Sequence, residues 1–229
     1  RYSLKNPKLY NDYNINGFFN ILELSREKEI KRIFYASSSS IYGDSKKFPL
    51  TENLSLNPKN IYALSKKINE ELAQLYSGLY GIQLTGLRFF TVYGEWGRPD
   101  MFIMKYIVAS LQKKIFYLNN FGNHYRDFTY IKDINKILYL LLKAKQKKKH
   151  EVLNICSSSP VKITSVISYL NSLMTKPKLK KIPLQTADVI KTHGSNTKLK
   201  KIISFKKFTN INSGLLNVFN WAKKNKVKF

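Results

Sequence analysis

Three kinds of side chain with complementary acid–base properties occur within residues 37–66. Serine hydroxyls occupy Ser37–Ser40, and Tyr62 precedes Lys66 by four positions. A phenol with an ordinary pKa of about 10 is a weak base at neutral pH, but a nearby ammonium group favours the phenolate. A serine hydroxyl stabilises an alcohol oxygen as it becomes a carbonyl. The combination is suited to taking a proton from a sugar hydroxyl while the attached carbon loses hydride.

The local pattern predicts how these residues are positioned. A strand-like apolar run, Ile33–Ala36, ends directly at the serines. Ligands of open α/β sheets bind where strands end in this way. Tyr62 and Lys66 project from one face of an expected helix, because apolar residues recur around them at helical spacing, namely Ile61, Leu64, Ile68, Leu72 and Leu75.

Each part of this pattern also has a purely structural explanation. Tyr and Lys are abundant in the chain, so a Tyr-x-x-x-Lys match also fits an ordinary amphipathic helix. The serine run also fits a simple strand-to-loop transition. The functional interpretation therefore depends on the surrounding sequence.

Five sequence blocks together resemble the extended short-chain dehydrogenase/reductase family, which includes the NAD-dependent epimerases and dehydratases. They occur in the family's order and spacing, and they resemble UDP-glucuronate 4-epimerases most. The blocks are Tyr35-Ala-Ser-Ser-Ser-Ser-Ile-Tyr-Gly43, Tyr62-Ala-Leu-Ser-Lys-Lys67, Gly86-Leu-Arg-Phe-Phe-Thr-Val-Tyr-Gly94, Trp96-Gly-Arg-Pro-Asp-Met101 and Arg126-Asp-Phe-Thr-Tyr-Ile131.

The resemblance implies NAD as cofactor and gives each catalytic residue a role. Tyr62 would be the base, Lys66 would hold the nicotinamide ribose and favour the phenolate, and Ser38 would be the hydroxyl partner. Counting within the serine run leaves the choice of serine open by one position. For Phe89, packing in the core is as good an explanation as a wall of the nicotinamide site. For Phe90, core packing is the weaker of the two explanations. The implied cofactor-binding set is Tyr62, Lys66, Ser37, Phe89 and Phe90.

The resemblance also implies a substrate site for a UDP-sugar. Arg98 would pair with the C6 carboxylate of a glucuronate, which a guanidinium fork binds bidentately. Its alternative is a surface arginine in a polar loop. Thr91 stands where several related epimerases have Asn, and Glu95 stands where Pro is common and would weaken binding of an anionic substrate. The implied substrate-binding set is Ser39, Ser40, Thr91, Arg98, Arg126, Asp188 and Arg1.

For three members of this substrate-binding set, the resemblance implies which part of the UDP-sugar they would lie near. Arg126 would hold the UDP phosphates, and Asp188 would lie near the ribose and phosphates. The residues before Asp188 lack the family's usual Pro-Gly, which weakens that match. Arg1, the first residue of the chain, would lie near the sugar.

The implied reaction is NAD-dependent epimerisation at C4 of a UDP-sugar, from UDP-glucuronate to UDP-galacturonate through a 4-keto intermediate. Two alternatives stay open within the class of enzymes: decarboxylation of UDP-glucuronate, because a 4-keto glucuronate is a β-keto acid, and another UDP-sugar epimerase or dehydratase. A third alternative, of another class, is a truncated, non-catalytic fragment that acts as a basic interaction protein.

Alternating helices and strands predict an α/β fold, a Rossmann-like, doubly wound parallel sheet with a small C-terminal α/β substrate-binding lobe. The resemblance assigns residues 1–91 and 126–157 to the NAD-binding domain, and 92–125 and 158–229 to the lobe. The 229 residues contain no Gly-x-x-Gly-x-x-Gly or Gly-x-Gly-x-x-Gly turn. We therefore expect a fragment that lacks the first strands of the family's sheet, about 85–90 residues with the glycine-rich phosphate-binding turn.

Composition limits the partners and the location. The net charge of +26 comes mostly from lysines spread along the chain, which favours a solvated surface over specific nucleic-acid binding. A single cysteine, Cys156, fits a reducing compartment, and no stretch of about 18 apolar residues predicts a membrane span. We expect a cytoplasmic protein without a metal site, because the histidines lack ligand spacing with one another, with acids or with Cys156; these are His124, His150 and His193. A homodimer is expected from the resemblance, through the helices near 10–29 and 59–80.

Overall fold

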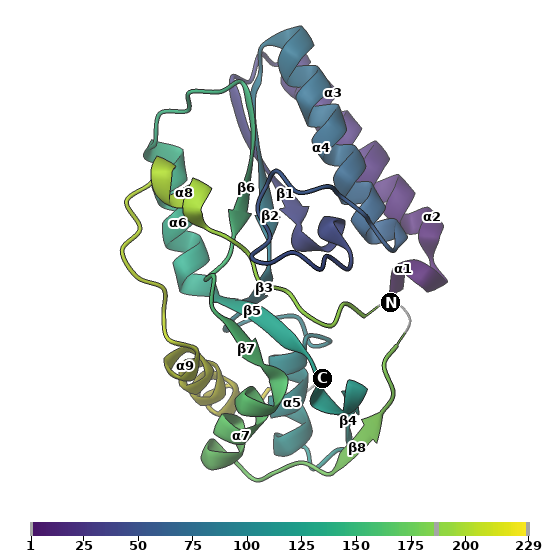
Figure 1. Ribbon diagram of the computed structural model, residues 1–229, viewed down its shortest axis with the longest axis vertical. Helices are drawn as coiled ribbons and strands as arrows, with labels where there is room; N and C mark the ends of the chain where they lie inside the picture. Colours follow the sequence, from purple (N-terminus) through teal and green to yellow (C-terminus); the bar gives the residue numbers. More distant parts are fainter. Residues whose placement is uncertain (1, 186–187, 228–229) are drawn as a thin grey trace.

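The central element is a three-stranded parallel sheet. A computed structural model describes residues 2–185 and 188–227, so Arg1 lies outside the described residues. The strands follow the order β1 (Arg32–Ser38), β2 (Gln83–Phe89) and β6 (His150–Ile155). Each strand pairs in parallel with its neighbour, so that Ser38, Phe89 and Ile155 lie side by side at the carboxyl edge (Figure 1).

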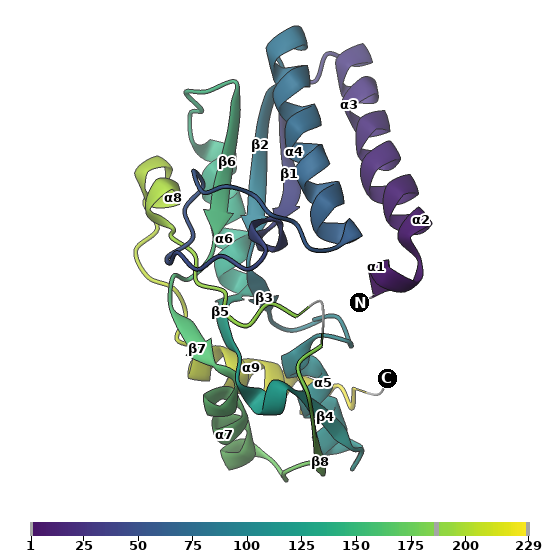
Figure 2. The same cartoon turned by 45° about the vertical axis from the view of Figure 1, so that its right-hand side comes forward.

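Helices cover both faces of this sheet. Helices α3 (Gly17–Glu27) and α4 (Ile61–Tyr80) lie side by side on one face, and α6 (Ile131–Lys143) lies on the other (Figure 2). Leu84 of β2 packs with the first pair and Leu87 packs with α6, because residues an odd number apart in a strand point to opposite faces. The expected α/β, doubly wound arrangement is therefore confirmed.

The ends of α4 carry recognisable capping residues. The Asn60 side chain accepts a hydrogen bond from the Ala63 backbone at 2.9 Å, and the helix ends at Gly81 in the left-handed conformation, with φ of 69°. Glycine adopts this conformation without a Cβ clash. The expected helix, ending near Gly81, is confirmed.

The second part of the molecule has its own small sheets and core. Strands β3 (Thr91–Tyr93), β5 (Tyr125–Tyr130) and β7 (Pro160–Lys162) form one sheet, and β4 (Phe116–Asn119) pairs in parallel with β8 (Leu179–Ile182). Strand β5, at the start of the expected range 126–157, thus pairs with β3 and β7. The apolar core lies among helices α5 (Phe102–Leu111), α7 (Ile163–Leu173) and α9 (Ile211–Lys224).

Several elements were not expected from the sequence. Strands β3 and β7 contain three residues each, too few for an alternating pattern to show, and β5 was also missed. Helix α8 (Thr197–Ile202) packs against β6. In place of one helix over 10–29, the chain forms α1 (Tyr2–Lys5), α2 (Pro7–Tyr10), a π-helical turn η1 (Asn11–Asn16) and α3. Within the described residues, no helix is both long and apolar enough to cross a membrane.

Candidate active site

The serine run lies at the carboxyl edge of the sheet. Strand β1 ends at Ser38, and a 3-10 turn η2 (Ser39–Tyr42) follows. The Ser38 hydroxyl accepts a hydrogen bond from the Ser40 backbone at 3.2 Å and donates to the Ser40 hydroxyl at 3.1 Å. Ser38 thus caps the turn and is held at the strand end, where the sequence predicted the catalytic hydroxyl.

The first turns of α4 bring Tyr62 and Lys66 to the same edge. The Lys66 ammonium donates to the Ala36 carbonyl of β1 at 2.9 Å, and burial lowers the pKa of Lys66. Tyr62 lies one helical turn earlier, and its ring makes an edge-on contact with Tyr10 at 6.0 Å between centroids. Helix α4 packs against both β1 and η2. The structure therefore brings the predicted phenol, amine and serine run together.

The N-terminal π-helical turn η1 supports this face of α4, and no sequence pattern predicted it. Asn14 donates to the Ser65 hydroxyl at 2.9 Å, and that hydroxyl donates to the Tyr62 carbonyl at 2.8 Å. A π-helical turn inserts an extra residue into the helical repeat and often marks functional sites. Asn14 is thus a positioning residue for Tyr62 that apolar periodicity does not reveal.

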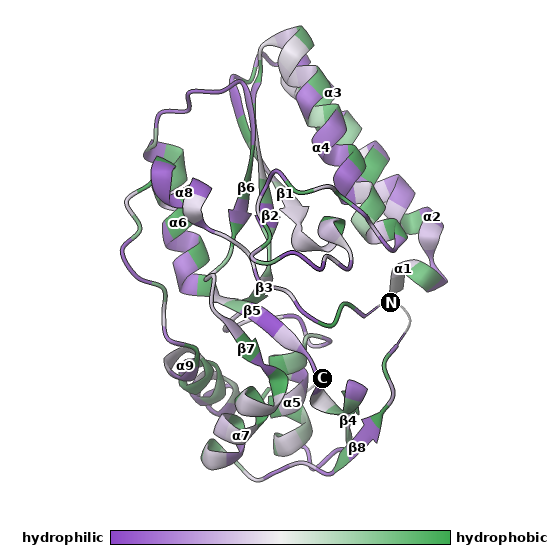
Figure 3. Ribbon diagram, in the orientation of Figure 1, coloured by the Kyte–Doolittle hydropathy of each residue, from purple (hydrophilic) through white to green (hydrophobic). Residues whose placement is uncertain are grey.

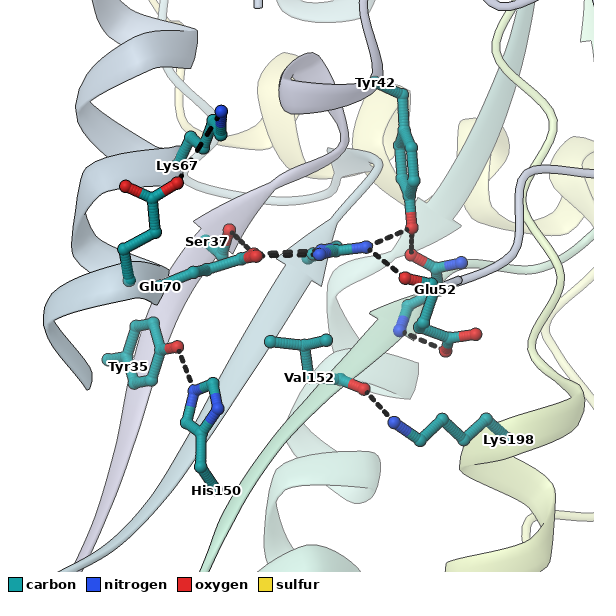
Figure 4. A network of polar contacts seen from close by, with 12 residues as sticks. Tyr35, Ser37, Tyr42, Glu52, Lys67, Glu70, His150, Val152 and Lys198 are labelled. Atoms are coloured by element: carbon teal, nitrogen blue, oxygen red, sulfur yellow. Dashed lines mark hydrogen bonds and ion pairs between the residues drawn. The ribbon is translucent and has the colours of Figure 1, made fainter. Parts of the chain in front are cut away.

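Ser37 points into a buried polar network (Figure 4). Its hydroxyl donates to a Glu70 carboxylate oxygen at 2.5 Å, and Ser37 is 3% exposed. Glu70 also forms a buried ion pair with Arg88 of β2, through Nε at 2.9 Å and Nη2 at 2.7 Å. The only sequence signal for this network is a charged residue, Arg88, inside an apolar strand.

The same network fixes the turn that follows the serines. Arg88 donates to the Tyr42 hydroxyl at 2.8 Å, and Tyr42 donates to the Asn154 side chain of β6 at 2.7 Å. Burial raises the pKa of Tyr42 to about 12, so this phenol stays protonated at neutral pH. The serine turn thus follows β1 directly and is hydrogen-bonded to β2 and β6. The bonding groups are the neutral Tyr42 phenol and the Arg88 guanidinium, whose charge is paired with Glu70.

The two phenylalanines at the end of β2 differ from the expectation. Phe90 is buried against Tyr42, Leu50 and Cys156, whereas Phe89 is partly buried. Core packing thus explains Phe90 more fully than Phe89, the reverse of what the sequence suggested. The strand ends at Phe89, so the next side chain turns into the core beside η2.

Arg98 lies in the loop between β3 and α5, where it pairs with Asp100. A bidentate ion pair joins its Nε and Nη2 to the Asp100 carboxylate at 2.9 and 2.6 Å. This hydrogen-bonded pairing with the Asp100 carboxylate raises the pKa of Arg98. Arg98 is exposed, and with Thr91 it lines a pocket at the start of the second part of the molecule.

Glu95 does not face this pocket. The Tyr130 hydroxyl donates to both of its carboxylate oxygens, at 2.8 and 2.9 Å, and the Lys132 ammonium lies 3.6 Å away. Its negative charge is therefore compensated locally. This removes the physical basis for the expectation that Glu95 weakens anionic-substrate binding.

Two further predicted residues, Arg126 of β5 and Asp188, lie in segments that pair with each other. Arg126 donates to the carbonyls of Tyr125 and Ile190, each at 2.9 Å. Burial lowers the pKa of Arg126, and the nearby Asp188 carboxylate opposes this shift. Asn119 of β4 donates to Asp188 at 3.4 Å. Strands β4 and β5 and the segment at 188–190, which are far apart in the sequence, thus come together around Asp188.

Fold and site together define a class of protein. A parallel sheet with helices on both faces carries a serine hydroxyl at its carboxyl edge, beside a helix with Tyr and Lys one turn apart. This is the arrangement of a Rossmann-like α/β protein with its candidate ligand site at the carboxyl ends of the strands.

The sequence comparisons place the chain within that class. Residues 1–156 match the profile of the NAD dependent epimerase/dehydratase family. The chain belongs to this family, whose members include nucleotide-sugar epimerases, which are isomerases.

Three relatives illustrate the similarity. The chain is 41% identical to an uncharacterized 37.6 kDa protein of the cld 5' region of Escherichia coli O111:H-, over 97% of this chain and 72% of that protein. It is 38% identical to UDP-glucuronate 4-epimerase 2 of Arabidopsis thaliana, over 96% of this chain but 55% of the plant protein. The structure of MoeE5 in complex with UDP-glucuronic acid and NAD superposes with a TM-score of 0.93 at 28% identity, covering 98% of this chain and 76% of that chain.

Proposed function

We infer that this chain supplies the catalytic part of an NAD-dependent epimerase that acts at C4 of a UDP-sugar, converting UDP-glucuronate to UDP-galacturonate. One observation carries the proposal: the Tyr62–Lys66 face of α4 lies against the strand end that holds Ser38, with Lys66 bonded to the Ala36 carbonyl. The names of the relatives support the substrate class.

The residues at the sheet edge fit the reactive end of NAD. Lys66 and Tyr62 are suited to the nicotinamide ribose, because an ammonium and a phenol can hydrogen-bond its hydroxyls. The chemistry supplied by a bound NAD would be the reversible acceptance of a hydride from the sugar. The cofactor set implied by the sequence, with Ser37, Phe89 and Phe90, is part of this proposal, although the hydroxyl of Ser37 is bonded to Glu70.

The chain's own residues perform the acid–base steps. The Tyr62 phenolate takes the proton of the sugar 4-hydroxyl, and the Lys66 ammonium favours that phenolate. Ser38 donates to the same oxygen as it becomes a carbonyl. After the 4-keto sugar turns over, Tyr62 returns the proton to the other epimer. Ser39 and Ser40 contact the sugar from the same turn.

The lobe residues select the substrate. Arg98 binds the C6 carboxylate of glucuronate, and Thr91 lines the same pocket. Arg126 and Asp188 hold the phosphates and ribose of UDP, in keeping with the hydrogen bond of Arg126 to the Ile190 carbonyl, two residues after Asp188. In this proposal residues 1–91 and 126–157 serve NAD, and 92–125 and 158–229 serve the UDP-sugar.

The test uses the full protein with NAD and UDP-glucuronate, with products separated by chromatography. UDP-galacturonate is the expected product, and Tyr62→Phe abolishes turnover while NAD stays bound. A pentose product would support a decarboxylase instead. Recovery of neither product would refute the substrate assignment, and full activity of Tyr62→Phe would remove Tyr62 from the mechanism.

A homodimer through α3 and α4 belongs to the same proposal. Both helices alternate hydrophobic and hydrophilic residues along their length (Figure 3). Several of their apolar side chains are exposed, including Phe19, Leu24, Leu75 and Leu79. Exposed apolar stripes on paired helices are typical of subunit interfaces. Leu79→Asp should yield a monomer in light scattering, whereas Leu142→Asp, at an exposed leucine of α6, should leave the dimer intact. A monomeric unmodified protein would contradict the proposal.

A further inference from the structure

The two-stranded ribbon β4–β8 has an inner and an outer face of different character. Phe116 and Leu118 are buried in the lobe core, whereas Tyr117 between them is 47% exposed. Ile115, two positions before Tyr117, is also exposed. The alternation of strand residues therefore places an aromatic and an aliphatic side chain together on the outer face.

Lysines lie beside these apolar side chains. The parallel register pairs Tyr117 with Lys180, whose ammonium lies 5.9 Å from the Tyr117 ring centroid. Lys178 is exposed and directly precedes β8, two positions before Lys180. Lys113 is exposed in the turn that leads into β4. We call Lys113, Ile115, Tyr117, Lys178 and Lys180 the ribbon face.

The sequence around the ribbon is unusually one-sided in charge. Residues 101–126 and 160–187, which include both strands, contain no Asp or Glu. Lysines next to exposed aromatic and aliphatic groups suit the boundary between anionic lipid headgroups and acyl chains, because tyrosine and the lysine stem are amphipathic.

The chemistry of lysine also favours an anionic lipid surface over nucleic acid as the partner of the ribbon face. Within residues 101–125 and 160–187 there is no arginine, the residue that reads phosphates and bases bidentately. Lysine acts as a hydrated point charge, which suits a fluid, diffuse array of headgroups. We propose that the ribbon face docks this protein on the surface of a membrane that contains anionic lipids.

The position of the ribbon is compatible with this role. It lies at the end of the molecule away from α3 and α4 (Figures 1 and 2). Docking through the ribbon face therefore leaves the exposed apolar faces of these two helices free.

Vesicle co-sedimentation tests the proposal with the full protein. Vesicles of phosphatidylcholine with phosphatidylglycerol should bind it, vesicles of phosphatidylcholine alone should not, and added salt should weaken the binding. The triple variant Lys113→Gln, Lys178→Gln, Lys180→Gln should bind at least about tenfold more weakly, because each lysine near an anionic surface contributes separately. Tyr117→Ser should weaken binding at constant charge.

A matched control removes the same charge elsewhere. Lys147→Gln, Lys148→Gln, Lys149→Gln changes an exposed turn before β6 and should retain binding. Equal losses in the two triple variants would show that only total charge matters and would overturn the proposal. So would absence of vesicle binding, or tighter binding of a single-stranded RNA through the same three lysines. Circular dichroism melting of each variant verifies that the fold is retained.

Discussion

The guanidinium of Arg88 and the carboxylate of Glu70 form a two-bonded ion pair beneath the serine turn, with side chains only 4% and 7% exposed. The pair links β2 to α4, and Ser37 and Tyr42 complete its hydrogen bonds. Breaking a buried pair leaves an uncompensated charge, which costs far more than losing a surface pair.

Glu70→Gln should therefore lower the free energy of unfolding by about 3–5 kcal/mol, because Arg88 stays buried without its counter-charge. Glu71→Gln is the matched control, since Glu71 pairs with Lys67 on the exposed side of the same helix, at 3.6 Å. That change should stay within about 0.5 kcal/mol. Urea unfolding measures both, and equal effects would contradict a structural role for the pair.

Lys66 should set the alkaline limit of turnover. Burial lowers the pKa of Lys66. The ammonium form is present below this lowered pKa. As the pH rises, Lys66 therefore loses its proton at a lower pH than an exposed lysine does. The midpoint of the alkaline decline in activity should therefore lie below about pH 10.4, the pKa of an ordinary lysine. Lys66→Arg keeps the positive charge and should move this limb to higher pH even if the rate falls. An unchanged limb in the arginine variant would exclude Lys66 as its origin.

Gly86 of β2 leaves space for the hydrogen bond between Tyr35 of β1 and His150 of β6. A Cβ at this position would lie 2.6 Å from the Tyr35 hydroxyl, which reaches His150 at 3.0 Å. Gly86→Ala should destabilise the protein by about 1–3 kcal/mol through this overlap. Gly78→Ala, on the exposed side of α4 with nothing within 4 Å of the new Cβ, should stabilise it by about 0.5–1 kcal/mol. Thermal melts that show the same sign for both variants would refute this account.

Cys156 should be inert in the folded protein. It is fully buried, and this burial raises the pKa of its thiol well above the ordinary value. The thiolate is the reactive form, so both access and ionisation oppose modification. A chromogenic thiol reagent should react with one equivalent only after denaturant is added, since the chain has a single cysteine. Rapid labelling at neutral pH without denaturant would show that this core opens.

Arg98 should distinguish acidic from neutral sugars. Under the proposed function, Arg98→Gln removes a charge-assisted contact and should raise KM for UDP-glucuronate about tenfold or more, with little change for UDP-glucose. Arg26→Gln is the control, because Arg26 pairs with Glu23 on α3, far from the pocket in sequence. Equal KM changes for the two sugars would assign Arg98 a structural role.

The sequence by itself determined the features that depend on local spacing. Helical periodicity placed Tyr62 and Lys66 on one face, and the run ending at Ala36 placed the serines at a strand end. These features arise from backbone geometry and from residues that are close neighbours in the chain, so one sequence suffices to predict them.

The tertiary structure decided which neighbours share a function. Ser37 and Ser38 have identical side chains, but Ser37 is bonded to Glu70 of α4, whereas Ser38 caps the turn. The hydrogen bonds from Arg126 to Ile190 and from Asn119 to Asp188 join segments that are far apart in sequence. Such contacts depend on how sheets and helices pack, and local periodicity carries no information about them.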